Sequence, residues 1–199
     1  MVRCFAAIAA LFFLVGCTAE SIWAPEEHVA RAIYRHDGPP TITLFTMVNN
    51  RSGSGAHSGL MVNGSQRVIF DPAGTFHHPE IPERNDVHFG IRPNVLKFYI
   101  DYHARETYHV VTQEVRVSPE VANRALRLVQ ENGAVPKALC TSAITGILRQ
   151  LPGFEGTKST LFPGNAMAQF AQIPGVKTDK FFDDSPDFNK DLPEQTRLN

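Results

Sequence analysis

The segment Thr41 to Val48 constrains the fold more than any other part of the sequence. It reads Thr-Ile-Thr-Leu-Phe-Thr-Met-Val, so β-branched or apolar side chains occupy both sets of alternating positions. Successive side chains of a strand point to opposite faces of a sheet, and a strand with one solvated face normally shows polar residues there. The segment therefore predicts a buried central strand.

A β-hairpin is predicted directly after this strand. Two extended segments, Ala56 to Val62 and Gln66 to Asp71, are joined by the turn residues Asn, Gly and Ser. A three-residue loop of this kind sets His57 opposite Asp71. A loop one residue shorter or longer would shift that pairing by one position.

Two further strands and three helices complete the predicted domain. Their ranges are Leu96 to Tyr102 and Glu106 to Val117 for the strands, and Ser118 to Gly133, Leu139 to Leu151 and Pro163 to Ala171 for the helices. The first of these helices begins with a capping hydroxyl and a proline, and the first two carry an apolar stripe. The expected fold class is α+β, with an antiparallel sheet packed against helices.

The N-terminus has the features of an export signal. Arg3 precedes an apolar run from Phe5 to Val15, which is too short to span a bilayer as a helix. The run ends in Leu-Val-Gly-Cys17, which resembles the bacterial lipobox. This resemblance implies that residues 1–16 are removed as a lipoprotein signal peptide and that Cys17 becomes lipidated. An ordinary exported protein cut near Ala19 is the alternative.

Three segments follow the predicted signal peptide. We expect residues 17–40 to form a tether with a marginal helix, residues 41–176 a single globular domain, and residues 177–199 a charged tail. A formal net charge of −1 gives no strong electrostatic attraction for nucleic acid, so we do not expect nucleic-acid binding. We expect the protein to be attached to a membrane through the lipidated Cys17. Because Thr18 rather than aspartate follows Cys17, analogy with bacterial lipoproteins favours the outer membrane, facing the periplasm.

Cys140 is the cysteine expected to persist as a free thiol, because Cys4 lies in the signal peptide and Cys17 is expected to be lipidated. It begins an amphipathic helix and lies on the apolar side of that helix. The start of a helix favours a thiolate, and its free N–H groups can hold an oxyanion. Core packing is the alternative role. A free thiol in an exported protein risks oxidation without a packing advantage, so we predict a nucleophile.

A cysteine nucleophile needs a base, and the base needs a polar group that orients it. His57 is the predicted base, and Asp71 is the predicted orienting group. His77 and His78 are the alternatives for the orienting role. Structural roles are also possible, since a histidine on a strand is more often structural and an aspartate before proline often stabilises its own turn.

The segment from Thr75 to Val95 is rich in proline, histidine and charge, and it predicts a long loop of the kind that can form a lid. We expect His77, His78 and His88 to contact substrate, with His88 exposed; a solvated loop without a function is the alternative. The histidines show no zinc-binding spacing, so neither a metal nor another cofactor is expected.

The order of these residues resembles a known family. The run His57-Ser-Gly-Leu-Met-Val at a strand start, an acidic residue at the end of the next strand, and Cys140-Thr-Ser at a helix start are similar to the circularly permuted NlpC-type branch of papain-like cysteine hydrolases. Lecithin-retinol acyltransferase-like proteins share this order of histidine before cysteine. The resemblance spans Ile42 to Leu151, and it implies a permuted papain-like α+β fold with Cys140 as nucleophile and His57 as base.

The resemblance and the expected location imply a lipid-anchored thiol hydrolase of the bacterial cell envelope. The expected reaction is cleavage of an amide bond, with peptidoglycan-type peptides as the substrate. One alternative is a lipid acyl or thioester hydrolase or acyltransferase. Another is a non-catalytic lipoprotein that binds a partner or a wall fragment and uses Cys140 only for packing.

Overall fold

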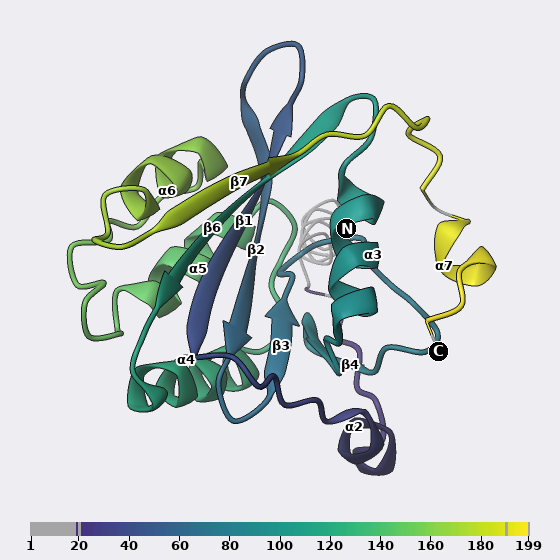
Figure 1. Cartoon of the computed structure of the whole chain (residues 1–199), viewed down its shortest axis with the longest axis horizontal. Helices are drawn as coiled ribbons and strands as arrows, with labels where there is room; N and C mark the ends of the chain where they lie inside the picture. Colours follow the sequence, from purple (N-terminus) through teal and green to yellow (C-terminus); the bar gives the residue numbers. More distant parts are fainter. Residues whose placement is uncertain (1–18, 20, 190, 199) are drawn as a thin grey trace, which may run out of the picture.

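The computed structural model describes residues 19, 21–189 and 191–198, and these residues form an α+β fold. A seven-stranded antiparallel open sheet has the strand order β4-β5-β3-β2-β1-β6-β7 (Figure 1). The strands are β1 Thr41–Asn49, β2 Gly55–Asn63, β3 Arg67–Phe70, β4 Glu83–Arg84, β5 Val87–Phe89, β6 Tyr108–Arg116 and β7 Lys177–Phe181. The helices of the described residues are α2 Glu26–Ala32, α3 Pro93–His103, α4 Pro119–Glu131, α5 Cys140–Leu148, α6 Pro163–Phe170 and α7 Leu192–Gln195.

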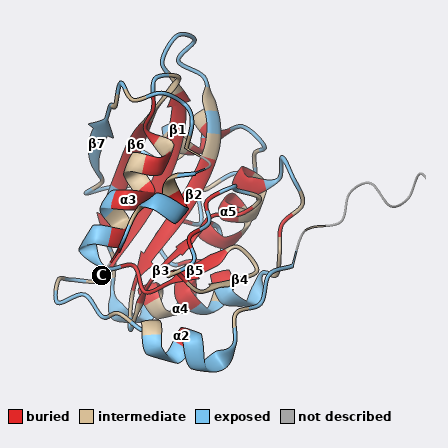
Figure 2. Cartoon of the chain, turned by 90° about the vertical axis from the view of Figure 1, so that its right-hand side faces the viewer, coloured by how far each residue is buried: buried red, intermediate tan, exposed pale blue. Residues whose placement is uncertain are grey.

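Helices cover both faces of the sheet. Helices α4, α5 and α6 lie on one face, and α3 lies on the other, so the central strands are buried between two layers (Figures 1 and 2). Each face has its own apolar core, and alternate residues of β1 contribute to each: Leu44 to the α5 side and Phe45 to the α3 side. Burial of apolar surface on both faces is the main stabilising term of such a layered domain.

The prediction of a buried central strand is confirmed. Residues 41–48 of β1 are all buried, and the strand pairs with β2 on one side and with β6 on the other. The strand predicted over Glu106 to Val117 is also confirmed as β6.

The predicted hairpin is present, but its register differs by two residues from the prediction. Val62 lies opposite Val68, where we expected it opposite Gln66. The loop has three residues, as predicted, but it comprises residues 64–66 rather than 63–65, because Asn63 still belongs to β2 and Arg67 begins β3. Side chains alternate with a period of two, so a two-residue shift leaves His57 and Asp71 on the same face of the sheet. A one-residue shift would have separated them.

The strand predicted over Leu96 to Tyr102 is wrong, because this segment belongs to helix α3. Pro93 occupies the first turn of the helix, where its missing N–H costs nothing. The buried side chains of the helix are Val95, Phe98, Tyr99 and Tyr102. Their spacing of three and four residues is helical, although aromatic and β-branched residues favour strands.

The three helices predicted in the second half of the chain are confirmed as α4, α5 and α6. Ser118 caps α4 by accepting a hydrogen bond from the backbone N–H of Val121, at 3.3 Å. Both α5 and α6 end within three residues of the predicted ends.

The segments predicted as tether and tail contact the domain. Helix α2 buries Val29, and the backbone N–H of Arg67 donates to the carbonyl of Tyr34 at 2.8 Å. At the other end of the chain, β7 pairs with β6 and extends the sheet. The region predicted as a loop from Thr75 to Val95 contains β4, β5 and the start of α3.

The predicted signal peptide, residues 1–16, and the predicted lipidation site Cys17 lie outside the described residues. Within the part of the chain that the structure describes, no helix has the length and apolar character that crossing a membrane requires.

Candidate active site

Cys140 begins helix α5 and is buried, with 7% of its surface exposed. Strand β3 ends opposite Leu60, and Ser58 lies two residues before Leu60 on β2, where its backbone N–H helps to lower the pKa of the Cys140 thiol. The hydroxyls of Ser58 and Thr141 lie 3.2 Å apart and join β2 to the first turn of α5. This contact holds the first turn of α5, and with it Cys140, against β2.

The surroundings of Cys140 favour its ionised form. Burial raises the pKa of the thiol, but hydrogen bonds from His57, Thr141 and Ser58 and the charge of His57 outweigh burial and lower the pKa to about 7. The residue that precedes the helix, Leu139, provides no side-chain cap. The first N–H groups of α5 are thus available to a negative charge near the thiol.

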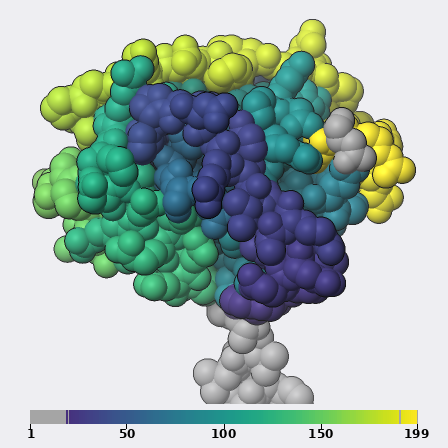
Figure 3. Space-filling view, turned by 60° about the horizontal axis from the view of Figure 1, so that its bottom comes forward, coloured from purple at the N-terminus to yellow at the C-terminus, as the bar shows by residue number. Residues whose placement is uncertain are grey.

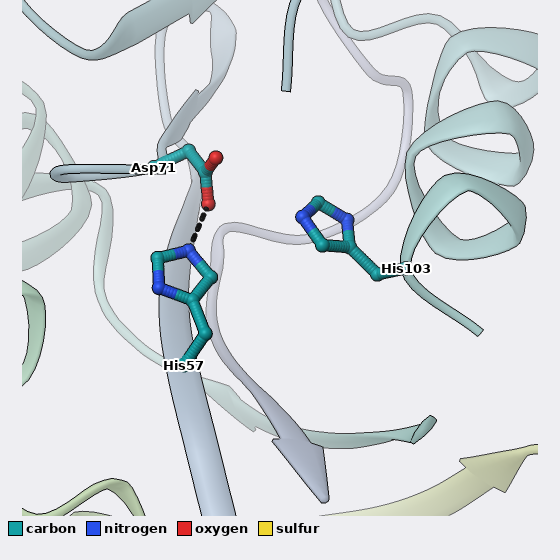
Figure 4. Close-up of side chains that lie close together, drawn as sticks. All are labelled: His57, Asp71 and His103. Carbon is teal, nitrogen blue, oxygen red and sulfur yellow. Dashed lines mark hydrogen bonds and ion pairs between the residues drawn. The ribbon is translucent and has the colours of Figure 1, made fainter. Parts of the chain in front are cut away.

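His57 links the thiol to a buried carboxylate. Its Nε2 lies 2.7 Å from Oδ1 of Asp71 (Figure 4), and its charge is one of the influences that lower the pKa of the Cys140 thiol. The predicted proximity of His57 and Asp71 is therefore confirmed, although the two residues are diagonal rather than direct cross-strand neighbours. The predicted nucleophile, base and orienting group occupy one site.

Tyr99 of α3 is a further contact of the carboxylate. Its hydroxyl donates to Oδ1 of Asp71 at 2.8 Å, and the tyrosine is fully buried. Gly59 makes this possible, since a Cβ at that position would collide with the Tyr99 hydroxyl. Gly59 is required here because the Tyr99 side chain lies close to the backbone of β2, and not because the backbone adopts an unusual conformation.

The interaction between the charges of His57 and Asp71 sets the protonation state of both side chains. Burial lowers the pKa of His57, but the charge and the hydrogen bond of Asp71, with a smaller contribution from Cys140, raise it to about 10. Burial raises the pKa of Asp71, and the facing imidazolium outweighs burial and holds that pKa well below its usual range. At neutral pH the arrangement favours an imidazolium between a carboxylate and a thiolate.

His103, the last residue of α3, stacks on His57 with the ring centroids 6.0 Å apart. Its Nδ1 lies 2.8 Å from the carbonyl of Tyr99, which can only accept, so Nδ1 carries the hydrogen and Nε2 is left unprotonated. Burial lowers the pKa of His103 to about 4, which keeps the ring neutral beside the imidazolium.

His57, Asp71 and His103 offer ligand atoms that all lie within 4.8 Å of one another. Two imidazoles and a carboxylate are suitable zinc ligands. A metal here would have to replace the hydrogen bond between His57 and Asp71, and the sequence spacing contained no signal for this cluster.

A pocket of about 300 Å³ opens beside His57 and His103. Its wall combines the end of β1, the start of β2, the turn after β3, the end of α3, the start of β6 and one residue of the C-terminal tail. The lining residues are Met47, Ala56, His57, Ala73, Gly74, Thr75, Tyr102, His103, Tyr108 and Asn189. The side chain of Asn189 donates to the carbonyl of Tyr102 at 3.0 Å, which fixes the tail against this pocket.

The loop histidines predicted to contact substrate lie away from this pocket. His77 is exposed, whereas His78 is buried and its Nε2 lies 3.0 Å from the carbonyl of Thr196. His88 was expected to be exposed, and this is wrong: it is 2% exposed and packs edge-on against Phe76. Its position on β5, between β3 and β4, explains its burial.

Sequence reasoning missed Tyr99 and His103 as parts of the site. Both lie on α3, whose segment was predicted to be a strand. The helical spacing of Val95, Phe98, Tyr99 and Tyr102 was the signal that could have revealed a helix with one face on the sheet.

Comparisons with known proteins give no assignment. No protein-family model, no curated protein and no solved structure matches this chain.

Proposed function

We propose that the protein is a thiol hydrolase in which Cys140 is the nucleophile, His57 the acid and base, and Asp71 the group that orients His57. The observation that carries the proposal is the pair formed by His57 and the buried Asp71 carboxylate, 2.7 Å apart, whose imidazolium lowers the pKa of the Cys140 thiol. A buried cysteine that served only in packing would not need an ionised partner network. The proposal keeps the permuted papain-like arrangement that the sequence resembles.

The proposed reaction begins with the thiolate of Cys140 attacking the carbonyl carbon of an amide or ester. The carbonyl oxygen becomes an oxyanion, which accepts hydrogen bonds from backbone N–H groups at the uncapped start of α5. The C–N or C–O bond then breaks, and the His57 imidazolium gives its proton to the leaving group. Water, deprotonated by His57, attacks the thioester and releases the acid and the thiolate.

Peptidoglycan-type peptides are the proposed substrate class, and the bacterial cell envelope is the proposed location. Both rest on the resemblance of the motifs and on the predicted signal peptide with lipidation at Cys17. A lipid anchor in the outer membrane would hold the enzyme close to wall material while the domain faces the periplasm. No cofactor is needed for this chemistry.

The test is turnover by the purified protein on peptidoglycan-derived peptides, followed by mass spectrometry. Cys140→Ala and Cys140→Ser should abolish product formation while the circular dichroism spectrum stays unchanged. His57→Ala should also abolish it, and the matched control His28→Ala, an exposed histidine of α2, should not. Full turnover by Cys140→Ala would remove the proposal.

A second candidate is a lipid acyl or thioester hydrolase or acyltransferase. The pocket beside His57 supports it, because Met47, Tyr102 and Tyr108 give that pocket apolar walls suited to an acyl chain. Release of fatty acid from acyl thioesters or phospholipids, with no cleavage of wall peptides, would favour this candidate. The opposite pattern would exclude it.

A non-catalytic binding lipoprotein is the remaining alternative. It predicts that Cys140→Ala retains affinity for a partner or wall fragment and that no substrate is turned over.

A further inference from the structure

Arg67, the first residue of β3, carries a buried charge for which the described residues provide no counter-ion. It is 6% exposed, and among the described residues its guanidinium takes part in no ion pair. Its Nε is fully buried and has no hydrogen-bond partner in that part of the chain. A buried charge without a partner carries a penalty of about several kcal/mol, so an unpaired buried arginine needs an explanation.

Neither neighbour of the guanidinium neutralises it. The ring of Tyr34 lies 5.6 Å from the guanidinium carbon, an interaction that contributes about 1 kcal/mol, less than the burial penalty. The charge of Glu114 favours the ionised guanidinium, but its carboxylate accepts a hydrogen bond from the Thr43 hydroxyl at 3.4 Å and forms no ion pair with Arg67 among the described residues. Glu114 is also exposed, where its field is screened by water.

Arg67 lines a pocket of about 390 Å³ at the turn end of the β2–β3 hairpin. The pocket also contains the exposed cations Arg116 and Lys177, and Glu114 is the acidic residue among those that line it. The complete lining is His36, Pro39, Thr41, Asn63, Arg67, Glu114, Val115, Arg116, Pro174, Gly175 and Lys177. Figure 3 turns this end of the molecule toward the viewer, with the N-terminal segment packed against the body of the domain.

The pocket also contains an unpaired acceptor. The side-chain amide of Asn63 donates to the carbonyl of Pro39 at 3.0 Å, which orients its oxygen. That oxygen, Oδ1, is buried and has no hydrogen-bond partner among the described residues. The pocket therefore offers unpaired donors on Arg67 and an unpaired acceptor on Asn63.

We propose that this pocket is a binding site for an oxyanion that also carries a hydroxyl, such as a hydrogen phosphate or phosphate monoester group, with Arg67 as its principal ligand. Two anionic oxygens would accept from the planar guanidinium, and the O–H would donate to Asn63 Oδ1. The site is separate from the proposed catalytic centre. Arg67 and Asp71 are four residues apart along an extended segment, a separation of about 13 Å.

The test uses the full protein, radiolabelled inorganic phosphate and equilibrium dialysis at neutral pH and constant ionic strength. Saturable binding of one phosphate is expected, and Arg67→Met should weaken it about tenfold or more, because it removes charge-assisted hydrogen bonds. Glu114→Gln should strengthen binding, since it removes the negative charge beside the site. Sulfate, which has no O–H at neutral pH, should compete more weakly than phosphate.

Two controls separate this site from general charge effects and from catalysis. Arg124→Met changes an exposed arginine of α4 that does not line the pocket, and it should leave phosphate binding unchanged. Cys140→Ala should also leave it unchanged, so a failure of the hydrolase proposal would not affect this result. Absence of saturable binding, or equal weakening by Arg67→Met and Arg124→Met, would overturn the proposal. Equal competition by sulfate would overturn the assigned role of Asn63.

Discussion

Arg67 and Asp71 are two buried charged residues on one short segment, and they differ in whether the described residues provide a charged partner. Arg67 begins β3 and Asp71 directly follows it, and their spacing from Ile69 puts both on the α3 side of the sheet. Asp71 bonds to His57 at 2.7 Å and to Tyr99 at 2.8 Å, whereas Arg67 has no ion pair among the described residues.

The difference shows how burial of a charge can serve two purposes. A charge that the protein itself neutralises holds another side chain in place, here an imidazolium next to a thiol. A charge left without a partner keeps its binding capacity for a ligand. The position of helix α3 accounts for this difference. The helix covers the part of the sheet that contains Asp71, whereas Arg67 lies at the other end and lines a pocket.

The largest expected effect follows from neutralising Asp71. Asp71→Asn leaves a buried imidazolium without its counter-ion, and we expect a loss of about 3 kcal/mol in the free energy of unfolding. Urea denaturation of both proteins measures this difference. Asp37→Asn, at an exposed position, is the control and should change stability by less than about 0.5 kcal/mol. A similarly small change for Asp71→Asn would contradict the comparison.

The reactivity of Cys140 tests the coupling within the same site. The thiolate is the reactive form, so the alkylation rate should rise with pH through an inflection near 7. His57→Ala removes the hydrogen bond and positive charge that lower the pKa of the thiol, so the inflection should move up toward or beyond the ordinary value of 9.0. Iodoacetamide labelling across pH measures both profiles. Identical profiles for the two proteins would show that His57 does not lower the pKa of the Cys140 thiol.

Tyr99 should have an intermediate effect. Tyr99→Phe removes one of the two hydrogen bonds to Oδ1 of Asp71 without removing the ring, and the loss should be about 2 kcal/mol, because the acceptor is charged. Thermal or urea unfolding measures it. Tyr108→Phe serves as control, since that hydroxyl makes no hydrogen bond to a described residue. Equal losses in the two variants would show that Tyr99 acts only by packing.

Arg67 should show the smallest effect on stability in the absence of added anion. Arg67→Met replaces an unpaired buried charge by an apolar side chain of similar length, so the free energy of unfolding should change by less than about 1 kcal/mol or increase. Urea denaturation in phosphate-free buffer measures this change. A loss as large as that of Asp71→Asn would mean that Arg67 has an internal partner and that the two ends of β3 do not differ.

The sequence predicted much of this architecture from local patterns. The unbroken apolar character of Thr41 to Val48 required a strand with both faces covered, and the structure confirms it. His57 and Asp71 meet even though the predicted register was wrong by two residues, because an even shift keeps the same faces together. The start of α5 at Cys140 also followed from sequence, since the apolar spacing of a helix is a local property.

The parts that could not be predicted depend on contacts between distant segments. The aromatic and β-branched residues of α3 resemble a strand locally, and packing of Phe98, Tyr99 and Tyr102 on the sheet selects the helix. The burial of His88 likewise depends on its strand neighbours.

The sequence by itself determined the α+β class, the central strand, the helix that begins at Cys140 and the shared face of His57 and Asp71, because these follow from residue periodicity within short segments. Tertiary structure alone decided that Tyr99 and His103 join the site and that, among the described residues, Asp71 has a counter-ion and Arg67 has none. The energy of a buried charge depends on which groups from distant segments surround it, and no local pattern contains that information.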